Sequence, residues 1–105
     1  MDTYFGLVEK LYAAGARNFL FINVPPIDRS PSTVSQGKNA VEMEAKALAS
    51  YNAKLVKRAQ KLVRAKGKQV WSKVFDSAKL FNFILDNPTP FRISNTTAFC
   101  AAYQM

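Results

Sequence analysis

The segment NFLFINVPPIDRSP, residues 18–31, joins an apolar run directly to two prolines. The run 18–24 has the length of a strand and lacks alternating polar positions, which is typical of a parallel strand covered on both faces. Pro25 and Pro26 have no amide hydrogen to donate to a neighbouring strand, so we expect strand pairing to end there. Such a strand requires neighbours, and the surrounding sequence indicates which elements supply them.

A short helix is predicted upstream, over residues 3–14. Asp2 or Thr3 can accept hydrogen bonds from the first-turn amides, and Gly15 stands where a left-handed C-terminal cap is favoured. The spacing of apolar residues places its buried face at Leu7, Val8, Leu11 and Tyr12.

Downstream, residues 25–40 are rich in Pro, Ser, Gly and Asn and are predicted to form a loop. A long helix is predicted over 41–66, and Gly67 ends it. Apolar side chains at three- and four-residue steps make up its buried stripe: Leu48, Tyr51, Leu55, Ala59 and Leu62.

A second strand is predicted over 68–76, followed by a helix that ends before Pro88. The order of elements predicts a βαβ unit with two recognisable parallel strands, within a partial three-layer α/β/α arrangement. Two strands alone would leave Phe19, Phe21 and Val24 poorly covered and both sheet edges open. The pattern therefore indicates part of a larger domain.

The amino-acid composition limits the classes of protein to which the chain can belong. The chain has 105 residues, of which 49% are hydrophobic and 21% charged, which is typical of a single globular domain. No apolar segment has the length of a membrane span. The first residues, MDTYFGLVEKL, lack the basic start and apolar core of a secretory signal.

The chain contains no histidine and one cysteine, Cys100. A Ser-His-Asp triad, a Cys-His dyad, a histidine-bearing zinc site and an internal disulfide therefore cannot be assembled from these 105 residues. We expect no metal or organic cofactor.

The net charge is +8, and eight Lys or Arg residues fall within 46–68. Two interpretations are open: a solvated helix face, or a small basic α/β module that contacts nucleic acid or an acidic partner through this helix. We favour the solvated face, because nucleic-acid readers usually interleave aromatic residues or glycines with such charges and this helix has only Tyr51. We expect neither a nucleic-acid nor a membrane partner.

Four ordered segments resemble the C-terminal part of GDSL-type esterases and lipases, the SGNH hydrolases, and most of all their fungal carbohydrate acetylesterases. The segments are LYAAGARNFLFINVPPIDRSP (11–31), YNAKL (51–55), VFD (74–76) and ILDNPTPFRISNTTAFC (84–100). One position departs from the pattern, since Arg92 stands where relatives have glycine. The resemblance makes residues 1–105 a single, partial hydrolase domain.

The resemblance implies a flavodoxin-like sheet with its active site at the C-terminal ends of the strands, and hydrolysis of acyl esters, including those of carbohydrates. The family's nucleophilic serine lies in a Gly-Asp-Ser motif, and its aspartate and histidine in an Asp-x-x-His motif. Neither motif occurs here, so no catalytic residue is assigned and the chain is expected to be inactive alone. The relatives are largely secreted.

Asn23, Pro25 and Pro26 follow the first strand and are the candidates for the rim of the substrate cleft. For the prolines the simpler interpretation, that they only end the strand, is favoured. The resemblance makes Cys100 one half of a disulfide in intact relatives. Asp76 matches a strand-end aspartate of the family and not that of the triad.

Overall fold

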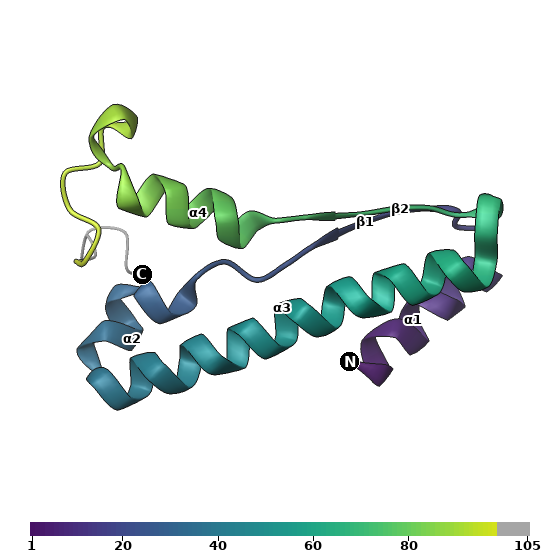
Figure 1. Cartoon of the computed structure of the whole chain (residues 1–105), viewed down its shortest axis with the longest axis horizontal. Coiled ribbons are helices and arrows are strands. Elements are labelled where there is room, and N and C mark those ends of the chain that lie inside the picture. The colour runs from purple at the N-terminus through teal and green to yellow at the C-terminus, as the bar shows by residue number, and fades with distance from the viewer. Residues whose placement is uncertain (99–105) are drawn as a thin grey trace. The chain divides into compact units, whose positions relative to one another are not determined.

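The computed structural model describes residues 1–98 (Figure 1). The helices are α1 (Asp2–Ala13), α2 (Pro31–Ser35), α3 (Lys38–Lys66) and α4 (Ser77–Asp86), and the strands are β1 (Asn18–Ile22) and β2 (Trp71–Phe75). Short 3-10 turns lie at Ile27–Arg29, Gly67–Gln69 and Thr89–Phe91. The predicted mixed α/β class with two parallel strands is confirmed.

The chain divides into two compact units. The first contains Met1–Asn23 and Ala49–Asp76, and the second contains Val24–Leu48 together with the chain from Ser77 onward. No described helix is both long and apolar enough to cross a bilayer.

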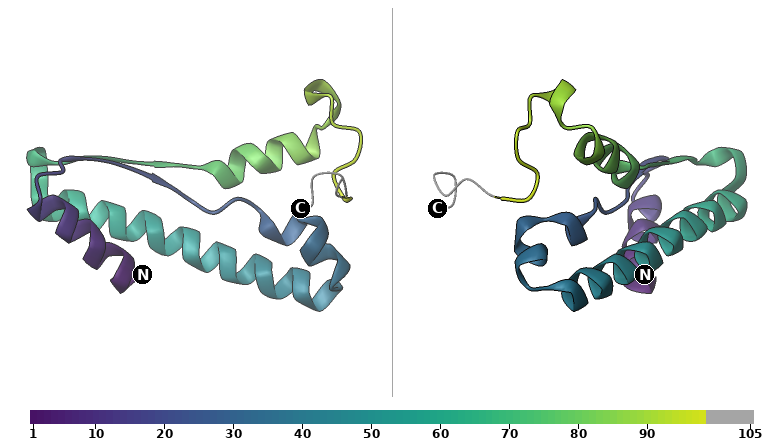
Figure 2. Two further views of the ribbon diagram at one scale, coloured as in Figure 1. Left: turned by 180° about the vertical axis from the view of Figure 1, so that it is seen from behind. Right: turned by 60° about the vertical axis from the view of Figure 1, so that its left-hand side comes forward.

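The first unit is built on the parallel pair β1 and β2, which are in register from Asn18 opposite Trp71 to Ile22 opposite Phe75. Parallel neighbours need a long crossover rather than a tight turn. The C-terminal part of α3 makes this return alongside the strands, as the views from the front and from behind both show (Figures 1 and 2).

The core of this unit lies between the sheet and two helices. Phe19 and Phe21 are buried against Phe5 of α1 and against the α3 stripe, in which Leu55 is 0% exposed. The ring centroids of Phe5 and Phe21 are 5.3 Å apart. The expectation that Phe19 and Phe21 would be poorly covered was wrong, because α1 and α3 both pack on their side of the sheet.

The opposite face of the sheet is open. Exposed fractions are 60% for Leu20, 59% for Ile22, 54% for Trp71 and 44% for Phe75. Within the described part of this unit, helices cover only one face of the strands, so the predicted three-layer arrangement stays a prediction.

The predicted face of helix α1 is confirmed in part. Val8 is buried and Tyr12 packs against the core, whereas Leu7 and Leu11 are exposed and Phe5 is buried instead. The predicted side-chain cap at the N-terminus of α1 was wrong, since no side chain caps the first turn. Asp2 instead pairs with Arg58 of α3, and this hydrogen bond and positive charge hold the pKa of the Asp2 carboxyl below its usual range.

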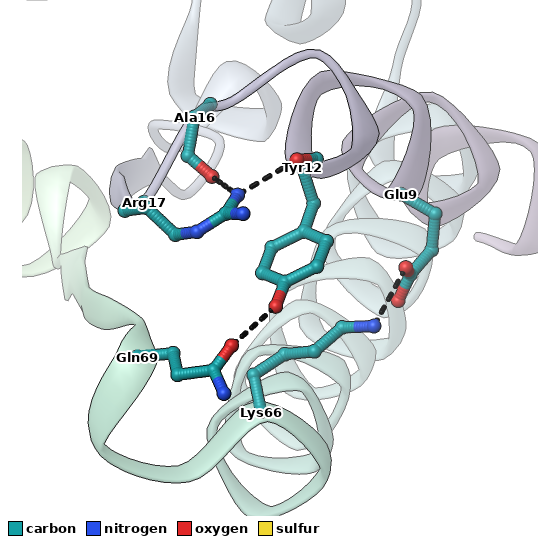
Figure 3. Close-up of polar contacts among 6 residues, drawn as sticks. All are labelled: Glu9, Tyr12, Ala16, Arg17, Lys66 and Gln69. Carbon is teal, nitrogen blue, oxygen red and sulfur yellow. Dashed lines mark hydrogen bonds and ion pairs between the residues drawn. The ribbon is translucent and has the colours of Figure 1, made fainter.

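A polar cluster around Tyr12 fastens the end of α1 to the turn that leads from α3 into β2 (Figure 3). The Tyr12 hydroxyl donates to Gln69 Oε1 over 2.7 Å. Arg17 lies over the Tyr12 ring, 3.9 Å from its centroid, and donates to the backbone oxygens of Tyr12 and Ala16. Lys66 lies 4.3 Å from the same centroid and pairs with Glu9.

In the second unit, the predicted loop over 25–40 contains the turn Ile27–Arg29 and helix α2. The sequence carries the start signal for α2, because Ser30 accepts from the Thr33 amide and Pro31 occupies the first helical position. Helix α3 then begins at Lys38, three positions before its predicted start at residue 41.

Arg92, the residue that departs from the resembled pattern, has a φ of 58° and lies in the left-handed region. This conformation costs a residue with a side chain about 1–2 kcal/mol. The backbone therefore takes the conformation that glycine favours, although the sequence supplies arginine.

We predict that Leu55→Ala lowers the free energy of unfolding by about 2–4 kcal/mol, because it opens a cavity in the core. Urea denaturation followed by circular dichroism measures the loss. Leu11→Ala is the matched control: its side chain is exposed, so its change should stay within about 0.5 kcal/mol. Equal effects of the two substitutions would contradict the packing described here.

We predict that Arg92→Gly raises the free energy of unfolding by roughly 0.5 kcal/mol. Relief of the left-handed strain slightly outweighs the extra freedom that glycine gives the unfolded chain. Arg92→Ala removes the same side chain and keeps the strain, so it should not stabilise. A gain for alanine equal to that for glycine would assign the effect to the arginine side chain instead.

Candidate functional site

The C-terminal ends of β1 and β2 carry a polar pair, of which Asn23 is buried and Asp76 is exposed. Asn23 directly follows β1, and its backbone amide donates to the Phe75 oxygen over 3.2 Å. Its side-chain Nδ2 donates to Asp76 Oδ1 over 2.9 Å. Both residues belong to the first unit, and the bond ties together the two strand ends at the edge where open parallel sheets bind ligands.

The strand register accounts for this pair. Ile22 lies opposite Phe75, so the next residues along the two parallel strands, Asn23 and Asp76, lie side by side. Sequence reasoning singled out Asn23 but did not connect it with Asp76, because register is set by pairing in space. The interaction pairs an amide with a carboxylate and holds the two strand ends together.

Pro25 and Pro26 belong to the second unit, where they line a cavity of about 250 Å³. The lining is mainly apolar, and from α4 it includes Phe81 and Leu85. The remaining lining residues are Ile27, Arg29, Ser30, Pro31 and Thr96. The prolines therefore form part of a wall as well as ending the strand.

Arg29 joins the two sides of this cavity. Its guanidinium lies 2.9 Å from the Asp86 carboxylate and donates to Asn82 Oδ1 over 3.0 Å. Both partners are on α4, so Arg29 holds the segment after β1 against that helix. Sequence patterns carried no signal for this contact between Arg29 and α4, because more than fifty residues separate the partners along the chain.

The basic residues of α3 are partly engaged within the first unit. Arg58 pairs with Asp2, and Lys66 pairs with Glu9. Lys54 and Lys57 line a surface hollow of about 360 Å³ beside Arg58. The two ion pairs thus engage two of the eight Lys or Arg residues within 46–68.

Two predictions remain, one on Cys100 and one on metal binding. Cys100 lies outside the described residues. Among residues 1–98, no group of three or more Cys, Asp or Glu side chains is arranged to hold a metal ion.

These features define an α/β protein whose parallel strands carry polar side chains at their C-terminal ends. Within that class, the chain is similar to an acetylesterase of Thermothelomyces thermophilus, with 35% identity over 100 residues. The match includes 94% of this chain and 33% of the acetylesterase, so the chain spans about a third of the length of this curated relative. No known protein-family model matches the chain.

We predict that Asn23→Asp destabilises the protein by about 2 kcal/mol at pH 7, because it replaces a hydrogen bond to a carboxylate by repulsion between two carboxylates. The repulsion raises the folded-state pKa of the pair above the unfolded value of about 3.9. The loss therefore grows as the pH rises through that value and shrinks below it. Urea denaturation at pH 4 and pH 7 measures this difference.

The control is Asn39→Asp, the same chemical change at an exposed position of α3. Because Asn39 lies in the first turn of α3, where a carboxylate is favourable, this substitution should not destabilise the protein at either pH value. If Asn23→Asp showed the same loss at pH 4 and pH 7, the Asn23–Asp76 contact would not be the cause.

Proposed function

We propose that this chain is part of an ester hydrolase of the GDSL type, related to acetylesterases. The observation that carries the proposal is the 35% identity to the Thermothelomyces thermophilus acetylesterase, which extends over 94% of the chain. Two features support it: parallel strands with polar residues at their C-terminal ends, and an adjoining sequence, Pro25-Pro26, that lines an apolar cavity.

In this proposal, residues 1–105 supply framework and substrate contacts rather than the reacting groups. Ester hydrolysis by a serine needs a base to take its proton and donors to hold the oxyanion. The chain has no histidine to act as that base. We assign the nucleophile, the base and the oxyanion donors to polypeptide beyond these residues, in the partial three-layer domain that the resemblance implies.

Within such a domain, the Asn23–Asp76 pair of the first unit would keep the ends of β1 and β2 at one level. The cavity lined by Pro25 and Pro26 in the second unit would by itself offer an apolar binding surface. Its apolar lining, with Phe81 and Leu85 on one side, suits the alkyl part of an acyl group better than the hydroxyls of a sugar. The proposal includes no nucleic-acid or membrane partner; in its support, Arg58 and Lys66 of the basic helix pair with acids of the first unit.

The expected result for the purified 105-residue chain is no hydrolysis of p-nitrophenyl acetate above the rate in buffer. The Thermothelomyces thermophilus acetylesterase, assayed in parallel, serves as the positive control. Turnover by the chain alone that disappears when one serine is replaced by alanine would show a complete active site within these residues and would contradict the proposal.

A further inference from the structure

The outer edge of strand β2 is a feature that the proposed function does not use. Among residues 1–98 the sheet has two strands, so only β1 pairs with β2. On the β1 side, the Trp71 amide donates to the Arg17 oxygen over 2.9 Å. Successive residues of a strand direct their backbone groups to opposite edges. The N–H and C=O groups of Ser72 and Val74 therefore point away from β1, toward an edge that no described strand occupies.

The middle of β2 also lines a cavity of about 510 Å³ whose other wall is α3. All of its lining residues belong to the first unit. We call this cavity the β2 groove and define it by Val56, Val63 and Arg64 of α3 and Ser72, Lys73 and Val74 of β2. Val56 and Val63 are 39% and 37% exposed, so the groove offers apolar surface to solvent. Its described lining includes the cations Arg64 and Lys73 and no acidic side chain.

The patterns of the two strands indicate that this edge stays available in a larger sheet. Strand β1 carries apolar side chains on both faces, as an inner strand does. Strand β2 has Ser72 and Lys73 near its centre, and lysine within a strand is typical of an edge. Further strands of a larger domain therefore belong beside β1, and the outer edge of β2 is left for a partner.

A second copy of the chain is a poor partner for this edge. Lys73 is the middle residue of β2, so a symmetric antiparallel pairing of two β2 strands brings Lys73 opposite Lys73. Like charges directly opposite each other destabilise a strand pair. The net charge of +8 on each copy adds further repulsion.

We propose that the β2 groove binds an extended acidic segment of another polypeptide, which adds to β2 as a further strand. In strand addition, backbone hydrogen bonds supply affinity and alternate side chains supply specificity. Here the backbone groups of Ser72 and Val74 make those bonds, and the cations Arg64 and Lys73 favour acidic side chains. The proposal does not depend on ester hydrolysis, because none of these residues is assigned to the reacting groups.

The two faces of β2 specify the side chains of this segment. Val74 lies opposite the buried Phe21 in the strand register, so it is on the core face. Every second side chain of the partner shares that face, next to Val56 and Val63, and should be apolar. Lys73 is exposed on the other face, where the intervening partner side chains should be acidic. The segment is thus one in which apolar and acidic residues alternate.

The probe is a fluorescein-labelled peptide with the sequence Val-Glu-Val-Glu-Val-Glu-Val and an amidated C-terminus. It is titrated with the full 105-residue chain and followed by fluorescence anisotropy, and saturable binding is expected. Two control peptides carry Lys in place of Glu, or Ser in place of Val. Neither should bind, because the first has the wrong charge and the second lacks the apolar side chains.

Substitutions on β2 test the charge. Lys73→Glu should weaken binding of the probe about tenfold, because a repulsive cross-strand pair replaces an attractive one. The matched control Lys54→Glu changes the net charge equally at an exposed position of α3 outside the groove. It should weaken binding by less than about twofold, because salt screens distant charges.

Substitutions of valine test the groove. Val63→Glu should also weaken binding about tenfold, because it places a carboxylate among apolar side chains. Val34→Glu makes the same change at a similarly exposed position of α2 and should weaken binding by less than about twofold.

Peptides with methylated backbone amides test strand addition itself. Only alternate residues of an added strand direct their amides to β2. Methylation of one set, the Val amides or the Glu amides, should therefore abolish binding, and methylation of the other set should leave it unchanged.

Three results would overturn the proposal: no saturable binding of the probe, equal effects of Lys73→Glu and Lys54→Glu, or binding retained by both methylated peptides. Ester hydrolysis is measured separately. A chain that binds the probe and hydrolyses no ester would support strand addition, and a chain that hydrolyses esters without binding the probe would contradict it.

Discussion

The first unit depends on the packing of Leu55 and its α3 neighbours against Phe19 and Phe21. Two parallel strands cannot be joined by a tight turn, so the chain must leave the sheet after β1 and return before β2. Helix α3 makes the return, and burial of its apolar stripe holds it against the strands. The Tyr12 cluster adds a polar contact between the end of α1 and the start of the second strand segment.

The same packing creates the candidate site. Because the strands are parallel, their C-terminal ends lie at the same edge of the sheet. Asn23 and Asp76 form a hydrogen bond there, although they are far apart in the sequence. The same packing leaves the other face of the sheet open, since α1 and α3 both cover the face that carries Phe19 and Phe21. Leu20 and Ile22 are consequently left exposed. The polar pair at the strand ends and the open apolar face are thus two consequences of one arrangement.

Local signals predicted much of the fold. The apolar run before Pro25, the three- and four-residue spacing around Leu55, and Gly67 located β1, α3 and the helix end close to their observed positions. Helix α2 was missed although Ser30-Pro31 carries its start signal, because the surrounding composition is typical of loops. The face of α1 was misjudged because Leu7 and Leu11 are as apolar as Phe5, and only the position of the sheet decides which of them is buried.

For the site, sequence reasoning selected Asn23, Pro25 and Pro26 from their place after a strand, and from the absence of histidine it excluded a complete triad in these residues. Both conclusions depend only on the identity and order of residues in the chain, so they hold whatever its tertiary structure is. The partners of Asn23 and Arg29, and the exposure of Ile22, depended on strand register and on helix α4. Those are contacts between residues more than fifty positions apart, and only tertiary packing brings such residues within hydrogen-bonding distance.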